Sequence, residues 1–412
     1  MLFADDTIIF TNGSKVSLSR LLSFLETYEK ASGQRVNKRK CSFLAPPKMS
    51  HTRIHQIANL TGFHHESTYI KYLGVPLCRG RIKASYFQPI IDKIQSRVSG
   101  WFSKLLSFGG KIILLRYVLS SMPLHLLAAM NPPVSIFDRI ERVFAAFLLN
   151  SSTESSKHHW ISWDALARPT QEGGIGVRRL SEVGDAFTFK RCWSLVQKAS
   201  LWSDYLSSKY FPNSSFSAAT LNSGCSRAWR NLIRVRPHFE KMSQIMLGDG
   251  SSGFFLDNWS GLGALKHFIP HHPWADLPYK LISVRLQRRA DDSLLTSLCS
   301  ILPSGVLADL IPAGINLHPG AHDKLAWTVE GDGAFSIWSA YNHLHQTCSF
   351  SVQLQRAFTE IFTPPAPLKI SFLMLRALRN RLPLDDNIKK LGIPLASACC
   401  CKNAFLGRIG SY

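Results

Sequence analysis

Residues 136–147 read Ile-Phe-Asp-Arg-Ile-Glu-Arg-Val-Phe-Ala-Ala-Phe, and this stretch decides the predicted fold class. Its apolar residues recur at intervals of three and four, which places them on one face of an amphipathic helix: Ile136, Ile140, Val143, Phe144 and Phe147. The same spacing occurs upstream, at Ile90, Ile91, Ile94 and Val98. We therefore expect several amphipathic helices packed together in this part of the chain.

Strand signals are short and lie near the beginning of the chain. Residues 1–4 and 7–10 are strand-like runs joined through Asp5 and Asp6, which predicts a β-hairpin. Residues 17–32 carry leucines at helical spacing, and Gly33 ends that predicted helix. Residues 71–77 predict one short strand. The expected fold class is α+β and mostly helical, with a small β region at the N terminus.

The bulk composition indicates a folded, basic protein. The chain has 412 residues, of which 45% are hydrophobic, so it can form two or three domains with real cores. The net charge of +21 favours polyanionic partners such as RNA or DNA. The lysines and arginines attract a polyanion at long range, and their contact with its phosphates releases the counterions bound there. A basic protein without such a partner would have the same composition, so charge alone does not define a site.

Cysteine usage and apolar stretches bear on the compartment. Three of the nine cysteines are adjacent, which is not the spacing of a disulfide framework and predicts an intracellular, reducing location. Asp5 and Asp6 interrupt any apolar run at the start, so we expect no signal peptide. Residues 112–130 form the longest apolar stretch but contain Arg116, Pro123 and His125. They predict a buried helix with a break, and we expect no membrane partner.

Asp5 and Asp6 are the candidate catalytic residues. Polymerases hold two divalent cations between the attacking and leaving oxygens, and hard cations prefer carboxylate ligands. A hairpin turn can expose two adjacent carboxylates while its apolar strands anchor it in a sheet. Adjacent aspartates are also ordinary turn residues. The tetrapeptide Phe3-Ala4-Asp5-Asp6 therefore does not establish a metal site by itself.

Several short motifs in a fixed order resemble the reverse transcriptases of LINE-type, non-LTR retrotransposons, most closely the plant kind. Phe3-Ala4-Asp5-Asp6 followed by Thr7, Ile8 and Ile9 is similar to the palm hairpin with the catalytic pair. Ser32-Gly33-Gln34-Arg35-Val36-Asn37 with Lys40 resembles the next palm element, and Tyr72-Leu73-Gly74-Val75-Pro76-Leu77 resembles the primer grip. Leu106-Ser107 with Gly109-Gly110-Lys111 resembles the thumb, and Gly173-Gly174-Ile175-Gly176-Val177 resembles the connector. Each motif is weakly specific, but their order and spacing together are strongly specific.

The last part of the chain resembles the zinc-binding domain that follows these reverse transcriptases. The matching motifs are Phe335-Ser336-Ile337, Pro367-Leu368-Lys369-Ile370, Asn380-Arg381-Leu382-Pro383 and Leu391-Gly392-Ile393. A structural zinc ion needs four ligands, of which Cys399, Cys400 and Cys401 could supply a first pair. No His or Cys follows Cys401, so the expected Zn²⁺ site is incomplete. The alternative is a solvent-exposed, oxidisable tail.

The resemblance implies an RNA-directed DNA polymerase that uses Mg²⁺, takes nucleotides as its only small-molecule substrates and works in the nucleus. The family's palm uses a further aspartate from an upstream strand, and its fingers and endonuclease also lie upstream. Since the chain begins two residues before Phe3, we expect Asp5 and Asp6 to form an incomplete site and the chain alone to be inactive. A non-enzymatic nucleic-acid-binding remnant and a translated pseudogene product remain as alternatives.

The candidate nucleic-acid-binding residues are Lys40, Lys71, Arg227, Arg230 and Arg234. Lys40 falls at the family's lysine position. The three arginines alternate with aromatic and aliphatic residues, a pattern that suits phosphate contact combined with base stacking. The same pattern suits a solvated helix face over a core that contains Trp229. The sequence does not decide between these two interpretations.

Four regions are expected from the motifs. Residues 1–84 would be the C-terminal remnant of the palm, with a β-hairpin remnant of the truncated palm at its start. Residues 85–155 would be thumb-like helices, and residues 156–330 the helical connector. Residues 331–412 would form a truncated, small α/β unit that resembles the zinc-binding domain.

Overall fold

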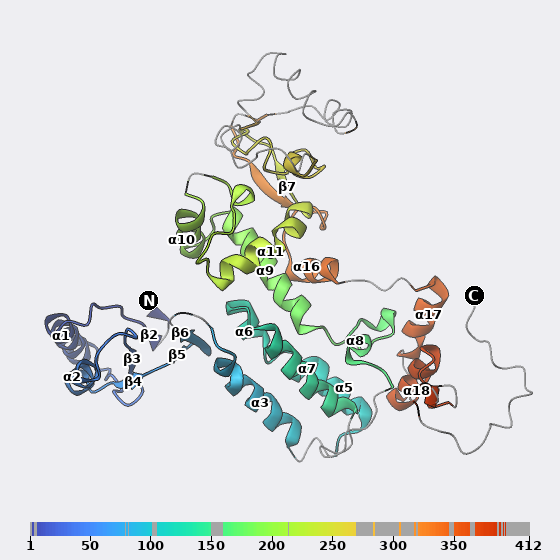
Figure 1. The fold of residues 1–412 in the computed structure, drawn as a ribbon, viewed down its shortest axis with the longest axis horizontal. Helices are drawn as coiled ribbons and strands as arrows, with labels where there is room; N and C mark the ends of the chain where they lie inside the picture. Colours follow the sequence, from blue (N-terminus) through green and yellow to red (C-terminus); the bar gives the residue numbers. More distant parts are fainter. Residues whose placement is uncertain are drawn as a thin grey trace, which may run out of the picture. The chain divides into compact units, whose positions relative to one another are not determined.

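The computed structural model describes residues 2–3, 6–78, 80, 82–100, 105–149, 160–212, 214–268, 283–284, 305, 317–318, 320–345, 350–362, 367–384, 387–388, 390 and 392. The chain divides into two compact units, residues 1–93 and residues 94–412. Helices predominate over short strands in both (Figure 1), which confirms the expected, mostly helical α+β class. The four predicted region boundaries stay a prediction.

The described part of the first unit combines three helices with short paired strands. The helices are α1 (Lys15–Ser32), α2 (His51–Thr61) and the 3-10 helix η1 (Ala84–Phe87), after which α3 (Gln88–Ser99) begins. The strands are β1 (Leu2–Phe3), β2 (Asp6–Thr7), β3 (Ser42–Leu44), β4 (His64–Glu66), β5 (Tyr69–Tyr72) and β6 (Val75–Cys78). β3 and β4 are parallel, and the other two pairs are antiparallel.

Helix α1 has the ends that its sequence predicts. The Ser14 hydroxyl oxygen accepts a hydrogen bond from the Ser17 amide at 3.1 Å, which caps the first turn. Gly33 adopts a left-handed conformation at φ 73°, and its amide donates to the Glu29 carbonyl. The predicted helix over residues 17–32, with its stop at Gly33, is confirmed.

The N-terminal hairpin is present with shorter strands than the sequence predicts. Phe3 pairs with Asp6 and Leu2 with Thr7. The prediction of one strand over residues 71–77 is wrong, because the chain turns back on itself at Leu73 and Gly74, with φ angles of 48° and 80°. Two residues at positive φ are the requirement of a tight hairpin turn. Pro76 is tolerated because it lies on an edge strand of this two-stranded sheet.

The second unit is largely helical where it is described. The helices before its loop-rich middle are α5 (Phe108–Leu114), η2 (Leu115–Leu119, a π-helix), α6 (Leu124–Ala129), α7 (Val134–Leu149), α8 (Trp163–Leu166), η3 (Thr170–Glu172), α9 (Leu180–Val196), α10 (Leu201–Tyr210), η4 (Phe216–Ala218) and α11 (Arg227–Lys241). They are followed by β7 (Ser243–Met246), η5 (Leu265–Phe268), β8 (Lys324–Trp327), α16 (Ile337–Leu344), α17 (Val352–Ile361) and α18 (Leu368–Leu378).

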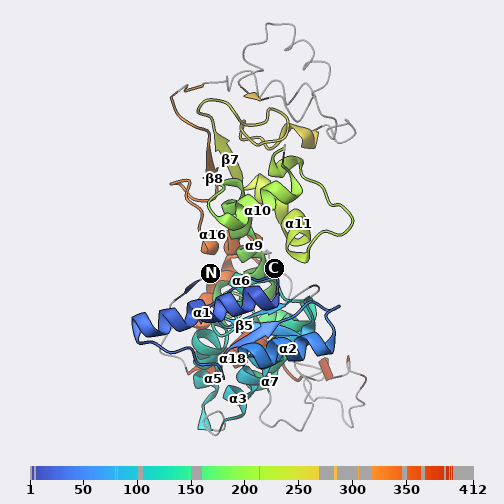
Figure 2. The same cartoon turned by 90° about the vertical axis from the view of Figure 1, so that its left-hand side faces the viewer.

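Helix α9 lies at the centre of this unit. Its buried residues fall on all sides of the helix, because α6, α7, α10, α11 and α16 all contact it (Figure 1). Phe189 of α9 packs edge-on against Phe239 of α11 and Trp327 of β8. β7 and β8 pair antiparallel (Figure 2), and Trp327 is the last residue of β8. The Trp327 indole donates to the Ser339 hydroxyl at 2.9 Å, which fixes α16 to the same core.

The segment Gly173-Gly174-Ile175-Gly176 is a packing junction. A Cβ on Gly173 would meet the Phe358 ring of α17 at 2.8 Å, and one on Gly174 would meet the Arg168 carbonyl oxygen at 2.1 Å. The Arg116 guanidinium packs against Gly176 and donates to the Ile175 carbonyl. Glycine is therefore required here for close approach of η2 and α17 to the loop.

The predicted break in the apolar stretch is confirmed. η2 ends at Leu119, and α6 begins only after Pro123. By length and composition, the helical stretch Phe108–Ala129 is the one described segment that could cross a membrane. Core helices pass the same test, and Ile112, Leu115 and Leu119 are fully buried against the protein. The absence of a membrane partner stays a prediction.

Candidate nucleic-acid interface

Helix α11 separates its cations from its apolar residues. Ser226 caps its N terminus, and the Ser226 hydroxyl oxygen accepts a hydrogen bond from the Trp229 amide at 3.2 Å. The helical spacing places five basic residues on one face, which we call the α11 basic stripe: Arg227, Arg230, Arg234, His238 and Lys241. Arg227 is half-buried, and the other four are exposed. The stripe is therefore a one-sided row of three arginines and one lysine, together with His238, and most of it faces solvent.

The opposite face of α11 is buried. Trp229 and Phe239 are 0% and 2% exposed. The Trp229 ring stacks on Tyr210 with a centroid distance of 4.3 Å and an interplanar angle of 4°. Of the two interpretations of this segment, the structure shows a solvated face over an aromatic core. Trp229 and Phe239 are not available to stack on bases, so only the cations of α11 can face a ligand.

Two of the stripe's arginines already have partners within the protein. Arg227 donates to the Pro132 carbonyl at 3.1 Å. Arg234 forms a two-pronged contact with the carboxylate of Asp185 on α9, with one N–O distance of 3.2 Å. Among the described residues, the exposed Arg230 has no ion pair. Arg230 is therefore the arginine of the stripe that is best placed for phosphate contact.

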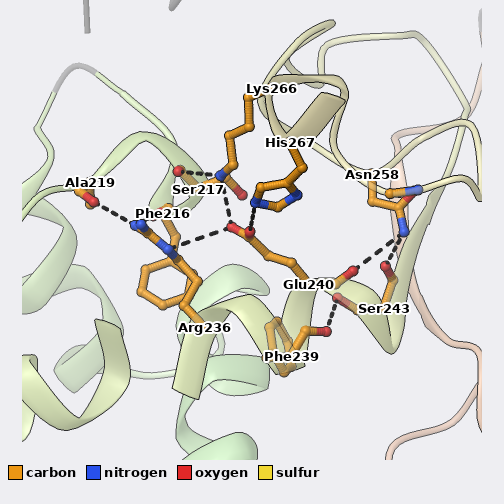
Figure 3. A network of polar contacts seen from close by, with 11 residues as sticks. Phe216, Ser217, Ala219, Arg236, Phe239, Glu240, Ser243, Asn258, Lys266 and His267 are labelled. Atoms are coloured by element: carbon orange, nitrogen blue, oxygen red, sulfur yellow. Dashed lines mark hydrogen bonds and ion pairs between the residues drawn. The ribbon is translucent and has the colours of Figure 1, made fainter. Parts of the chain in front are cut away.

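An inward-facing charge network holds α11 in place (Figure 3). Arg236 donates to the carbonyls of Phe216, at 3.0 Å, and Ala219. The Glu240 carboxylate lies 3.2 Å from Lys266 and 3.7 Å from Arg236. Lys266 also donates to the Ser217 carbonyl at 2.7 Å. Burial lowers the pKa of Lys266, and the nearby Glu240 opposes that shift.

The network serves packing rather than ligand binding. Arg236, Glu240 and Lys266 have nearly buried side chains and bridge α11 to the chain at residues 216–219 and 265–267. A cavity of about 30 Å³ beside them is lined by Ser217, Glu240 and Asp257, among others. It is large enough for one water molecule and too small for a nucleotide. Burial raises the pKa of Asp257 there.

The candidate residues of the first unit lie on separate elements. Asp6 is exposed on β2, whereas Asp5 lies outside the described residues. Lys40 is exposed in the turn before β3, where its amide donates to the Asn37 carbonyl at 2.9 Å. Lys71 is exposed on β5 opposite Pro76. The geometry of the aspartate pair is thus not described, and the two lysines remain candidates for phosphate contact.

The candidate zinc ligands Cys399, Cys400 and Cys401 lie outside the described residues. Within the described ranges there is no group of three or more His, Cys, Asp or Glu residues that could hold a metal ion. The described cysteines, Cys41, Cys78, Cys192 and Cys225, are dispersed over both units. The described residues therefore do not fit a structural zinc ion.

Sequence reasoning missed the exposed aromatic residues of α10. Trp202, Tyr205 and Lys209 follow one another at helical spacing, and that spacing would have been the signal. The Arg236–Glu240 pair was also readable as an i, i+4 pair. The contact of Glu240 with Lys266 joins residues 26 positions apart and has no local signal.

Comparison with known proteins shows which families the chain is similar to. A family profile described as zinc-binding in reverse transcriptase matches residues 335–406. A candidate ribonuclease H protein of Arabidopsis thaliana is 32% identical over 296 residues, which are 66% of this chain and 44% of that protein. An uncharacterized 149 kDa protein of the Xenopus laevis transposon TX1 is 28% identical over 178 residues, which are 42% of this chain and 13% of that protein.

The chain is related to retrotransposon reverse transcriptases. The resemblance predicted from the sequence motifs is thereby confirmed at this level. An uncharacterized mitochondrial protein of Arabidopsis thaliana is also similar, with 25% identity over 142 residues that cover 34% of this chain and 92% of that protein. The reverse-transcriptase-related chain spans less than half of the candidate ribonuclease H protein.

Proposed function

We propose that this chain is part of a retrotransposon RNA-directed DNA polymerase and binds RNA or DNA through phosphate contacts of the α11 basic stripe. The observation that carries the proposal is the one-sided arrangement of these cations over a buried aromatic face. The net charge of +21 adds long-range attraction for a polyanion. The names of the relatives support a nucleic-acid partner.

Salt dependence tests this proposal. Each phosphate contact releases condensed counterions, so the logarithm of affinity should fall linearly with the logarithm of salt concentration. In fluorescence anisotropy with a labelled duplex, the double variant Arg230→Gln, Lys241→Gln should bind more weakly at every sequence. Its salt slope should be smaller by about 1 for each phosphate that the variant no longer neutralises. Arg356→Gln combined with Lys369→Gln removes two exposed cations from α17 and α18 and is the matched control.

Two results would overturn the proposal. The first is binding by the wild-type chain that does not depend on salt. The second is a control variant whose affinity falls as far as that of the stripe variant, because that would assign binding to overall charge rather than to α11.

We also propose that these 412 residues alone do not polymerise. Asp6 is an exposed residue of a two-residue strand, and a pair of adjacent carboxylates offers fewer ligands than a two-metal site uses. Template-dependent incorporation of nucleotides in Mg²⁺ would be measured for the purified chain and for Asp6→Ala. Incorporation by the wild type that Asp6→Ala abolishes would refute this proposal.

A further inference from the structure

Helix α10 exposes a row of apolar and aromatic side chains to solvent. Leu201, Trp202 and Tyr205 are 88%, 36% and 59% exposed. Helical spacing places these three residues and the exposed Lys209 on one face, which we call the α10 aromatic row. The opposite face carries the buried Ser203 and Leu206. The row is therefore not the side by which α10 packs onto the protein.

Both ends of helix α10, which carries the α10 aromatic row, are held by hydrogen bonds or ring contacts. Ser200 and Ser203 form a reciprocal capping box at the start of the helix, with distances of 3.2 and 2.9 Å. At its end, Tyr210 stacks on the buried Trp229 of α11. The Tyr210 hydroxyl also accepts a hydrogen bond from the Ser226 amide at 3.2 Å. Because Ser226 caps α11, the end of α10 lies beside the start of α11.

A cation lies among the exposed rings. The Lys209 ammonium is 5.4 Å from the ring centroids of both Tyr205 and Tyr210, and 3.2 Å from the Tyr205 hydroxyl. Lys209 is a cation at neutral pH, and the hydrogen bond with Tyr205 raises its pKa further. An exposed ring beside a fixed positive charge presents both a stacking surface and a phosphate contact.

The exposed rings and the neighbouring cations favour single-stranded nucleic acid over a duplex or an apolar protein partner. A duplex keeps its base faces inside its own stack, whereas a single strand presents them to aromatic rings. Lys209 within the row and the basic stripe on the neighbouring helix α11 favour a polyanion over an apolar protein surface. Resting on the proposed function, we propose that the α10 aromatic row stacks on bases of single-stranded RNA or DNA whose phosphates contact the α11 basic stripe. The row would give the chain a preference for single strands, independent of sequence.

Anisotropy titrations on the full chain test the preference. The probes are a labelled oligo(dT) of about 20 nucleotides and a labelled duplex of the same length. The variants are Tyr205→Leu, and Tyr205→Leu combined with Trp202→Leu, which keep apolar bulk but remove the rings. Single-strand affinity should fall about tenfold for each ring, and duplex affinity should change by less than about twofold. Tyr117→Leu replaces a 72% exposed tyrosine on η2 and is the matched control.

The outcomes separate this proposal from the one on which it rests. Equal losses for single strand and duplex, or full retention of single-strand affinity by both leucine variants, would overturn the role of the α10 aromatic row. Retention would leave an apolar protein partner as the explanation of the exposed row. If the Arg230→Gln, Lys241→Gln variant still weakened both probes, phosphate binding by α11 would stand. If that variant had no effect either, the proposed function would fail as well.

Discussion

Asp323 shows how one carboxylate can organise a loop. It lies just before β8 and accepts hydrogen bonds from the amides of Gly248, Gly250 and Ser252 at 2.7, 2.9 and 2.8 Å. The Ser252 hydroxyl donates to it at 2.6 Å. Burial alone would raise the pKa of Asp323, but the hydrogen bonds from Ser252, Gly248 and Gly250 together lower it. The charged carboxylate thus ties residues 248–252 to the start of β8.

Asp323→Asn should destabilise the second unit by about 1–3 kcal/mol, because it weakens several charge-assisted bonds. Since the folded-state pKa of Asp323 is depressed, its stabilisation is present above the unfolded value of about 3.9 and is lost as the pH falls through the folded value. Urea unfolding followed by tryptophan fluorescence at pH 7 and pH 3 would measure both effects. The two proteins should differ less at pH 3, and Asp138→Asn, on the exposed face of α7, is the control.

On the proposed function, Asp185 would compete with nucleic acid for Arg234. The carboxylate neutralises Arg234 and adds a negative charge beside the α11 basic stripe. Asp185→Asn should therefore strengthen binding to RNA and DNA, by about two- to fivefold at low salt, since exposed charge interactions of this kind are worth about 0.2–1 kcal/mol. The gain should disappear at high salt. Weaker binding by Asp185→Asn, measured by anisotropy, would mean that Arg234 serves packing and does not face the ligand.

At the scale of elements, local signals predicted several of the helices. The leucine spacing and Gly33 predicted α1, and the apolar stripe over residues 136–147 predicted the core face of α7. The β5–β6 hairpin was missed because Leu73, a poor residue for positive φ, occupies half of its turn. Helix α11 was predicted with its cations, but its composition fits both a base-stacking face and a core. Contacts with Tyr210 and Phe189 decide that question, and they arise from other helices.

The charge network around Glu240 links helix α11 to neighbouring segments, and its removal should lower the free energy of unfolding. Glu240→Gln removes the negative charge that faces Lys266 and Arg236, and so leaves buried cations uncompensated. We expect a decrease of about 3–5 kcal/mol in unfolding free energy. Lys266→Met combined with Glu240→Gln should recover part of it, because fewer uncompensated charges remain buried. Glu360→Gln, exposed on α17, is the control in the same urea titration. A double variant less stable than Glu240→Gln would show that the network stabilises by hydrogen bonding rather than by charge balance.

At the scale of the whole molecule, the two units differ in how much core they contain. Each sheet described in residues 1–93 has two strands, and such pairs are marginal in water without further cover. Apolar side chains of this unit remain in solvent, with Phe10 and Phe24 83% and 66% exposed. In the second unit, α9 is surrounded by other helices, and Phe189 and Trp327 are fully buried. We therefore expect the two units to unfold at different free energies.

Hydrogen exchange would measure this difference directly. Amides of residues 6–13 should exchange much faster than those of residues 111–120, where Ile112, Leu115 and Leu119 are buried in a continuous helix. Amides of α1 should exchange at an intermediate rate, because the helix is capped at both ends but buries little more than Leu18. Fast exchange at both the hairpin and α1 would mean that the first unit is unstable as a whole. Strong, equal protection of residues 6–13 and 111–120 would contradict the expected difference in exchange rates. A hairpin of two-residue strands could be so protected only if other residues packed over it, and Ile9 and Phe10 are exposed instead.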